Sequence, residues 1–192
     1  MIVEELALAP GLLIAMPQLH DRNFERAVVL MIAHDDEGSL GLVINQPSPI
    51  KAAELLESLE MAWQGDARAV VWSGGPVDRS TGWVLHEPVA DLETLDVGGG
   101  TTTIAPGVSL SRTPERLRSL AARPPGRIRL LLGYSGWAAG QLASEMALGS
   151  WLHTSIDPRL IFDVPPEEMW AAAVRSLGIT NPESVVQSHG IH

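Results

Sequence analysis

The segment Ala27-Val-Val-Leu-Met-Ile-Ala-His-Asp-Asp-Glu-Gly-Ser-Leu-Gly-Leu-Val-Ile-Asn45 places two apolar runs on either side of a short acidic turn. The runs at 27–33 and 40–44 are rich in Val, Ile and Leu, which favour β-strands. Between them, Asp35-Asp36-Glu37-Gly38 offers turn-forming side chains and a glycine that can adopt a positive φ. The segment therefore predicts a β-hairpin.

Further strands and helices are predicted outward from this hairpin. Apolar runs between turn signals predict strands at 12–16, 69–72, 83–86, 128–132 and 160–162. A polar cap followed by proline predicts helix starts at Ser48-Pro49, Thr113-Pro114 and Asn181-Pro182, with Pro166 as a variant. A helix is also expected over 138–148, and a polar loop over 98–103. Because strands and helices alternate without a regular βαβ rhythm, the pattern favours an α+β fold.

Composition excludes several kinds of chemistry. The 192 residues include no Cys, which removes disulfides, thiol nucleophiles and thiolate metal sites. His residues lack the spacings typical of zinc sites, so no metal and no cofactor are expected. The net charge of -10 disfavours binding to phosphate backbones and anionic membranes.

The first residues lack the basic segment of a secretory signal, since the first basic residue is Arg22. The apolar stretch 6–19 is interrupted by Pro10, Gly11 and Pro17, and falls short of the roughly 20 residues of a membrane span. A cytoplasmic protein is expected.

A candidate ligand cleft is predicted where polar residues follow strands. Asn45 ends one apolar run and Ser73-Gly74-Gly75 ends another, while His34 and His86 each close a strand. Loops at strand ends commonly line binding clefts, and the glycines allow a close approach of backbone to a ligand. Tight turns and hydrogen bonds to the backbone explain the same residues equally well.

The segment Gly133-Tyr-Ser-Gly-Trp137 is expected at a strand-to-helix junction, where it nearly spells the nucleophile elbow G-x-S-x-G. Trp137 stands where that motif requires glycine, so a turn and N-cap role for Ser135 is favoured over a nucleophile. Anion binding by the backbone N–H groups at such a helix start is an alternative function. Tyr134, Ser135 and Trp137 complete the predicted cleft, and no catalytic residue is assigned.

Basic residues cluster between 112 and 129, and Arg112, Arg116 and Arg123 are predicted to form a face for an acidic protein partner. Groove insertion into DNA is less favoured, because no second helix precedes the segment to make a helix-turn-helix. The indoles of Trp137, Trp151 and Trp170 are predicted to belong to the core.

Blocks spread along the chain carry a resemblance to a known family. They include Gly11-Leu-Leu-Ile-Ala-Met-Pro17, Gly41-Leu-Val-Ile-Asn45, Gly82-Trp-Val-Leu-His86 and Leu132-Gly-Tyr-Ser-Gly-Trp-Ala-Ala-Gly-Gln-Leu142. In this order they resemble the YqgE/AlgH family of bacterial proteins, from about residue 10 to residue 179. That family commonly has Ala where this chain has Ser135, which is a further argument against a nucleophile.

The resemblance implies a single α+β domain over residues 1–192, with a bifurcated mixed sheet curled into a pseudo-barrel, flanking helices and a flexible tail from about residue 187. It also implies a transcriptional regulator without an established biochemical activity. We therefore expect regulation through a small ligand or a protein partner. Direct DNA binding is the second hypothesis, and a hydrolase using the loops around His34, Asn45, His86 and Ser135 is the third.

Overall fold

A computed structural model describes residues 7–93 and 99–187. The chain divides into two compact units, which we call unit 1 (residues 1–45 and 134–192) and unit 2 (residues 46–133). Unit 2 is thus an insertion in the sequence of unit 1, and one long strand, β9 (Ile128–Ala138), begins in unit 2 and ends in unit 1. The single domain over residues 1–192 stays a prediction, and the tail beyond Gln187 lies outside the described residues.

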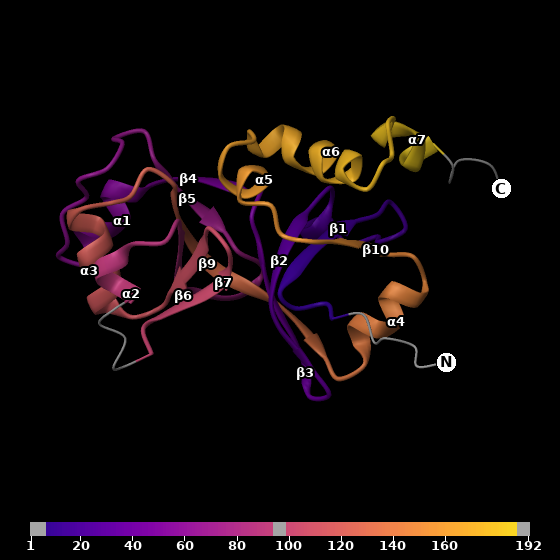
Figure 1. Ribbon diagram of the computed structural model, residues 1–192, viewed down its shortest axis with the longest axis horizontal. Helices are drawn as coiled ribbons and strands as arrows, with labels where there is room; N and C mark the ends of the chain where they lie inside the picture. The colour runs from indigo at the N-terminus through magenta and orange to yellow at the C-terminus, as the bar shows by residue number, and fades with distance from the viewer. Residues whose placement is uncertain (1–6, 94–98, 188–192) are drawn as a thin grey trace. The chain divides into compact units, whose positions relative to one another are not determined.

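Unit 1 contains an antiparallel sheet in the order β10–β1–β2–β3–β9 (Figure 1). Besides β9, its strands are β1 (Gly11–Ala15), β2 (Val28–Asp35), β3 (Gly38–Val43) and β10 (Trp151–Thr154). All of β1 and the first four residues of β2 are buried, since these positions lie inside the sheet and carry only apolar side chains and glycine, while the exposed end of β2 carries His34 and Asp35.

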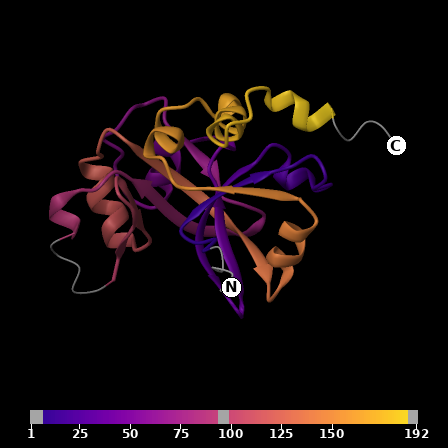
Figure 2. The ribbon, with the colours of Figure 1, turned by 45° about the vertical axis from the view of Figure 1, so that its right-hand side comes forward.

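Short helices accompany this sheet. They are η1 (Arg22–Phe24), α4 (Gln141–Ala147), α5 (Pro158–Phe162), α6 (Pro166–Ser176) and α7 (Pro182–Gln187). Helix α6 packs on β1 and β2, as the two ribbon views show (Figures 1 and 2). It does so through an apolar stripe at helical spacing, made of Met169, Trp170, Ala173 and Val174.

Unit 2 is organised around the first part of β9, which pairs in parallel with β5 and also neighbours β6. The sheet branches at this strand, because β4 joins β5 while β8 and β7 follow β6. The strands are β4 (Pro47–Lys51), β5 (Val70–Ser73), β6 (Val77–His86), β7 (Thr101–Ala105) and β8 (Val108–Ser111). The helices are α1 (Ala52–Ser58), α2 (Ala90–Glu93) and α3 (Pro114–Ala122).

The predicted hairpin and several helix starts are confirmed. Strands β2 and β3 pair so that Asp35 faces Gly38 across the turn. Helix α3 begins at Pro114, and the Thr113 hydroxyl accepts a hydrogen bond from the Arg116 N–H. Helices α6 and α7 likewise begin at the predicted prolines.

Three predicted elements are wrong for identifiable reasons. Residues 160–162 lie in helix α5, because Asp157 caps the Pro158 start. Ser48-Pro49 lies in strand β4, since proline pushes the residue before it into extended backbone, and the helix starts only at Ala52. Residues 101–103 belong to β7 and not to a loop, in keeping with the strand preference of Thr.

The strand-to-helix junction predicted at 133–137 is also wrong, because these residues continue β9. Gly133, Ser135 and Trp137 are buried while Gly136 and Ala138 are exposed, which is the period of two typical of a strand. Ser135 pairs with Gly41 of β3 and therefore does not cap a helix. Helix α4 begins only after Gly140, whose φ is 73°.

Candidate functional site

The residues predicted to form a cleft are divided between the two units. Unit 1 contains His34, Asn45, Tyr134, Ser135 and Trp137, and unit 2 contains Ser73, Gly74, Gly75 and His86. Of the three surface hollows described below, only one is lined by any of them, namely by Ser73. A ligand cleft formed by all of these residues together therefore stays a prediction. Each residue has a local environment of its own.

Asn45 joins backbone groups on the chain segment that leads into β2. Its Oδ1 accepts a hydrogen bond from the Val28 N–H at 2.9 Å, and its Nδ2 donates one to the Arg26 carbonyl at 2.9 Å. Both ends of the amide are thus engaged with the backbone. This arrangement fixes the conformation of Arg26, which has a φ of 51°.

Gly74 and Gly75 lie where backbone approaches backbone. The Gly74 N–H donates to the Leu132 carbonyl at 2.8 Å. Gly133 has a φ of 79°, and a Cβ atom placed there would lie 2.5 Å from the Gly75 carbonyl oxygen. The glycines are thus needed for close packing of chain segments within unit 2.

Trp137 belongs to an aromatic cluster in the core of unit 1. Its ring centroid lies 6.1 Å from that of Phe24 and 5.8 Å from that of Trp151. Both indole N–H groups donate to the same carboxylate oxygen of Glu145, at 3.0 and 2.8 Å. With exposures of 5% for Trp137 and 2% each for Trp151 and Trp170, the predicted core placement of the three indoles is confirmed.

The two histidines differ in environment. His34 is exposed near the hairpin tip, and its Nδ1 lies 2.7 Å from the Ser39 hydroxyl. His86 is fully buried, with Nδ1 2.7 Å from the Glu87 carbonyl and Nε2 2.9 Å from the Ser111 hydroxyl. Since a carbonyl only accepts, Nδ1 carries a proton. The Ser111 hydroxyl also lies 2.7 Å from the Thr101 hydroxyl, so His86, Ser111 and Thr101 form one chain of buried polar groups.

The largest of the three hollows, which we call the unit 2 hollow, has a volume of about 490 Å³. Its wall is mainly apolar, and Arg112, Arg118, Ser80, Ser111 and Thr113 bring polar groups to it. The Arg112 guanidinium carbon lies 5.2 Å from the ring centroid of Trp83, a cation–π geometry. The apolar residues that line it include Leu55, Leu59, Met61, Trp83, Leu117 and Leu130.

A second hollow, the unit 1 hollow, has a volume of about 430 Å³. It lies between the chain segment 15–26 and Trp170, and charged side chains of both signs line it. A third and smaller hollow of about 260 Å³ lies next to Trp72, over which the buried Arg129 is stacked at 4.0 Å.

The predicted basic face is altered by the end of α3. Arg123 has a φ of −144° and lies outside the helix, so Arg116 and Arg123 are not one face of a continuous helix. Arg112 lines the unit 2 hollow. The role of the three arginines in binding a partner stays a prediction.

In the residues that the structure describes, 7–93 and 99–187, no group of three or more His, Asp or Glu side chains could hold a metal ion. Within the same residues, every helix is too short or too polar to cross a lipid bilayer.

Comparison with known proteins decides the family. The family model described as AlgH-like matches residues 12–182. The chain belongs to the AlgH-like family. A UPF0301 protein of Myxococcus xanthus is 40% identical to this AlgH-like chain over 186 residues, which cover 96% of the chain and 98% of the relative. A UPF0301 protein of Variovorax paradoxus is 42% identical over 175 residues, covering 87% of each.

Solved structures extend the comparison to the fold. The solution structure of the AlgH protein from Pseudomonas aeruginosa is 34% identical to this AlgH-like chain, with a TM-score of 0.74 over 96% of this chain and 95% of that one. A crystal structure of a protein from Corynebacterium diphtheriae is similar in fold, with 20% identity, a TM-score of 0.69 and coverage of 96% and 92%. The predicted fold class, α+β with a curled mixed sheet, is confirmed by this similarity.

Of the residues that line the two larger hollows of this AlgH-like chain, sequence analysis singled out Arg112 and Trp170 but not Trp83, Leu117 or Arg26. Trp83 lies in a predicted strand and Leu117 in a predicted helix, but their position beside Arg112 depends on how β6, β8 and α3 come together. No local sequence pattern marks Arg26, because its strained backbone is fixed by Asn45, 19 residues away.

Proposed function

We propose that this AlgH-like protein is a cytoplasmic regulator that responds to a small amphipathic carboxylate bound in the unit 2 hollow. One observation carries the proposal: an apolar hollow of about 490 Å³ has the Arg112 guanidinium stacked on Trp83 in its wall. Ligand sites are typically concave and apolar, with a few polar groups that fix the orientation of the ligand.

The apolar wall supplies the driving force for binding an alkyl chain. Leu55, Met61 and Leu117 line the hollow, and removing each CH₂ group of a ligand from water contributes about 0.8 kcal/mol. Leu59 also lines it and is 46% exposed, an apolar surface that a ligand would cover.

Arg112 supplies selectivity for an anionic head group. A guanidinium donates two parallel hydrogen bonds to a carboxylate, and stacking on an indole orients its plane. The neighbouring Arg118 already donates to the Glu60 carbonyl at 3.4 Å, so Arg112 is the cation that we assign to the head group. Thr113 lines the same hollow, and its hydroxyl, which accepts from the Arg116 N–H, can still donate a hydrogen bond, whereas the Ser80 hydroxyl already donates to Asp78 at 2.6 Å.

A calorimetric titration tests the proposal, with decanoate below its micelle concentration as the probe and decanamide as a neutral ligand of similar shape. We expect saturable binding of decanoate, weaker binding of decanamide, and a loss of about ten- to hundredfold in affinity in Arg112→Ala, from a charge-assisted hydrogen bond of about 1.5 to 3 kcal/mol. Arg123→Ala is the matched control, since Arg123 is not among the residues of the hollow. Equal binding by wild type and Arg112→Ala would refute the assignment.

A second candidate, an esterase, is favoured by the hydrogen bond between Ser111 and His86. Ser111 lines the hollow, and its hydroxyl lies 2.9 Å from Nε2 of His86, which is the distance between a nucleophile and its general base. Both side chains are fully buried, which favours a structural bond and keeps ligand binding first. Turnover of p-nitrophenyl decanoate that is lost in Ser111→Ala would reverse this order.

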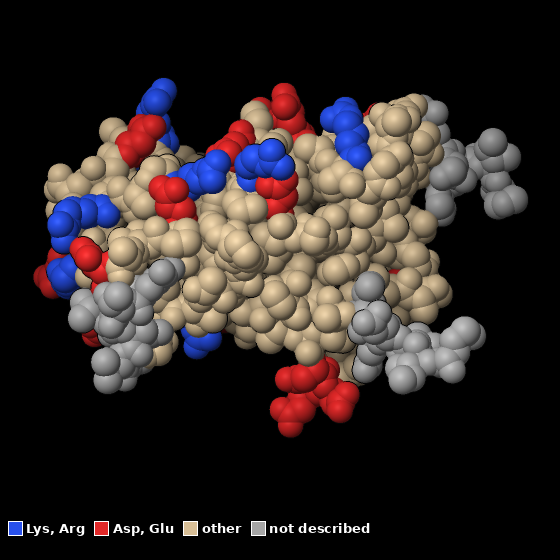
Figure 3. Space-filling view, in the orientation of Figure 1, with Lys and Arg blue, Asp and Glu red and all other residues tan. Residues whose placement is uncertain are grey.

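Direct DNA binding is disfavoured by charge. The chain carries a net charge of -10, and Figure 3 shows acidic side chains gathered over the tip of the β2–β3 hairpin, where Asp35, Asp36 and Glu37 are exposed. We expect no gel shift of generic duplex DNA at physiological salt. Submicromolar binding that weakens in Arg116→Ala and Arg123→Ala would instead support the DNA-binding hypothesis.

A further inference from the structure

Arg26 has an unusual backbone for its residue type. Its φ of 51° lies in the left-handed region, which residues with a Cβ atom rarely occupy. Asn45 holds this conformation, because it binds the Arg26 carbonyl on one side and the Val28 N–H on the other, each at 2.9 Å. Residues held in rare backbone conformations are concentrated at functional sites, which makes the side chain of Arg26 worth following.

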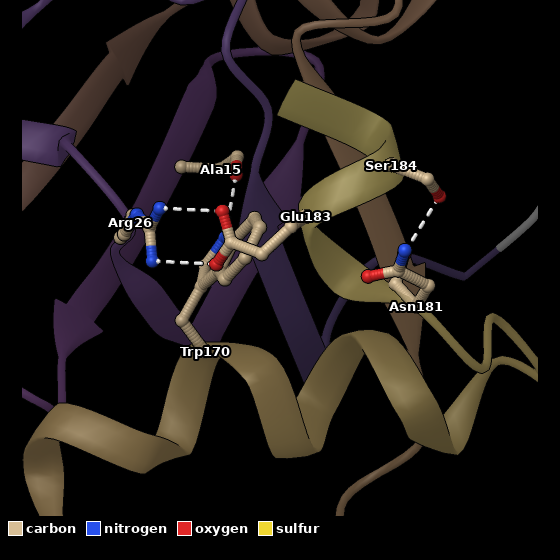
Figure 4. A network of polar contacts seen from close by, with 6 residues as sticks. All are labelled: Ala15, Arg26, Trp170, Asn181, Glu183 and Ser184. Carbon is tan, nitrogen blue, oxygen red and sulfur yellow. Dashed lines mark hydrogen bonds and ion pairs between the residues drawn. The ribbon is translucent and has the colours of Figure 1, made fainter. Parts of the chain in front are cut away.

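The guanidinium of Arg26 lies close to both an indole and a carboxylate, those of Trp170 and Glu183 (Figure 4). Its central carbon is 5.0 Å from the ring centroid of Trp170, and that ring is itself fixed by a 2.8 Å hydrogen bond from its N–H to the Ala15 carbonyl. The two terminal nitrogens donate to the two oxygens of Glu183, at 3.1 and 3.0 Å. This is the bidentate geometry by which arginine recognises carboxylates.

Arg26 and Trp170 both line the unit 1 hollow of about 430 Å³. Its wall continues from Trp170 over Met16, Pro17 and Leu19, which offer apolar contacts, and Arg22 adds a second cation. Arg26 therefore faces both the carboxylate of its own chain and a space that is large enough for a small molecule.

Glu183 reaches Arg26 from α7, a helix of only six residues. A helix of this length is unstable without tertiary contacts. The Arg26–Glu183 pair is therefore one of the contacts that keep α7 in place, together with its packing against α6.

We propose that Arg26 and Trp170 form a carboxylate-binding site that Glu183 occupies as an internal ligand. A small carboxylate with an aromatic or apolar body, seated in the unit 1 hollow, displaces Glu183 from Arg26 and frees α7. This site is in unit 1 and does not depend on the ligand proposed for unit 2.

The competition between the two carboxylates sets the size of the effect. Arg26 and Glu183 are each 53% exposed, and ion pairs this exposed are weak. An external carboxylate binds only those molecules in which Arg26 is not paired with Glu183. Its apparent affinity is therefore the intrinsic affinity multiplied by the fraction of unpaired molecules. Removing the Glu183 charge should therefore tighten external binding by roughly two- to sixfold.

The experiment titrates the full-length chain with phenylacetate, and with phenylacetamide as the uncharged ligand of the same shape. The variants are Glu183→Gln, which removes the internal ligand, and Arg26→Lys, which keeps the charge but removes the planar pair of donors. Glu167→Gln is the matched control, because Glu167 is an exposed acid in the first turn of α6. Calorimetry gives the affinities, and hydrogen exchange of residues 182–187 reports on α7.

We expect phenylacetate to bind wild type, to bind Glu183→Gln about two- to sixfold more tightly, and to leave the affinity of Glu167→Gln unchanged. Arg26→Lys should lose at least tenfold in affinity. Phenylacetate should speed the exchange of α7 by up to about two- to sixfold in wild type and not in Glu183→Gln, because the contact between Arg26 and Glu183 is already absent in that variant.

Several results would overturn the proposal. They are an absence of saturable binding in both wild type and Glu183→Gln, equal binding of phenylacetamide, or binding that is unchanged in Arg26→Lys. Equal affinity in wild type and Glu183→Gln would show that Glu183 does not compete for Arg26, and binding without faster exchange of α7 in wild type would show that the pair does not hold α7. Either result would also overturn the proposal.

Discussion

Replacing Asn45 by Ala should lower the free energy of unfolding by about 2 to 4 kcal/mol. The N–H of Val28, at the buried start of β2, is left without its acceptor, which costs about 1 to 3 kcal/mol. The bond to the Arg26 carbonyl is exposed, so its loss adds only about 0.5 to 1.5 kcal/mol. The substitution also removes the contact that holds the strained backbone of Arg26, and the bidentate pair with Glu183 should weaken with it.

Urea unfolding of the full-length chain measures this loss. Tryptophan fluorescence and circular dichroism must give coincident transitions for a single free energy to be defined. Gln64→Ala, which truncates an exposed amide, should change the free energy by less than about 0.5 kcal/mol and serves as control. If Asn45→Ala costs less than about 1 kcal/mol, water replaces both bonds and the structural role argued for Asn45 is refuted. A ligand-contacting role would then be the better explanation.

Three further outcomes follow from buried side chains. Trp170→Ala should cost about 3 to 5 kcal/mol in denaturant unfolding, because the buried indole leaves a cavity, and a loss below about 1 kcal/mol would place that indole at the surface. Ser135 should not react with a serine-directed phosphonate, since it is fully buried in β9, and stoichiometric labelling seen by mass spectrometry would contradict this. Burial lowers the pKa of His153, so the unfolded chain takes up the proton first and stability should fall as the pH drops below the ordinary value of about 6.5. Urea unfolding should show a smaller fall between about pH 7 and 5 for His153→Gln, and an equal fall would exclude His153 as its source.

The sequence was informative wherever a local signal and the tertiary structure agree. The β2–β3 hairpin was predicted from two apolar runs on either side of turn-forming residues. Helix α3 was predicted from a Thr cap before proline. The helix expected from Ser48-Pro49 failed because Pro49 imposes extended backbone on Ser48, and the segment instead forms β4, which pairs with β5.

The candidate sites were less predictable, because their residues meet only through the fold. The amide of Asn45 was correctly singled out as a polar group at a strand end, but its partners, Arg26 and Val28, are set by the pairing of β1, β2 and β3. Glu183 reaches Arg26 across 157 residues of sequence. A contact of this kind leaves no local pattern from which it could be predicted.

The passage of β9 from unit 2 into unit 1 has a consequence for synthesis on the ribosome. Unit 2 is continuous in sequence and ends at Gly133, so all its strands have been synthesised before the chain reaches β10. The sheet of unit 1 cannot be completed at this stage, because β1 and β3 have unpaired edges until β10 and the last part of β9 have been synthesised. At about 5 to 20 residues per second, the stretch from Tyr134 to Thr154 takes roughly 1 to 4 s to synthesise. During that interval the nascent β1–β2–β3 meander exposes two strand edges that can pair with another chain.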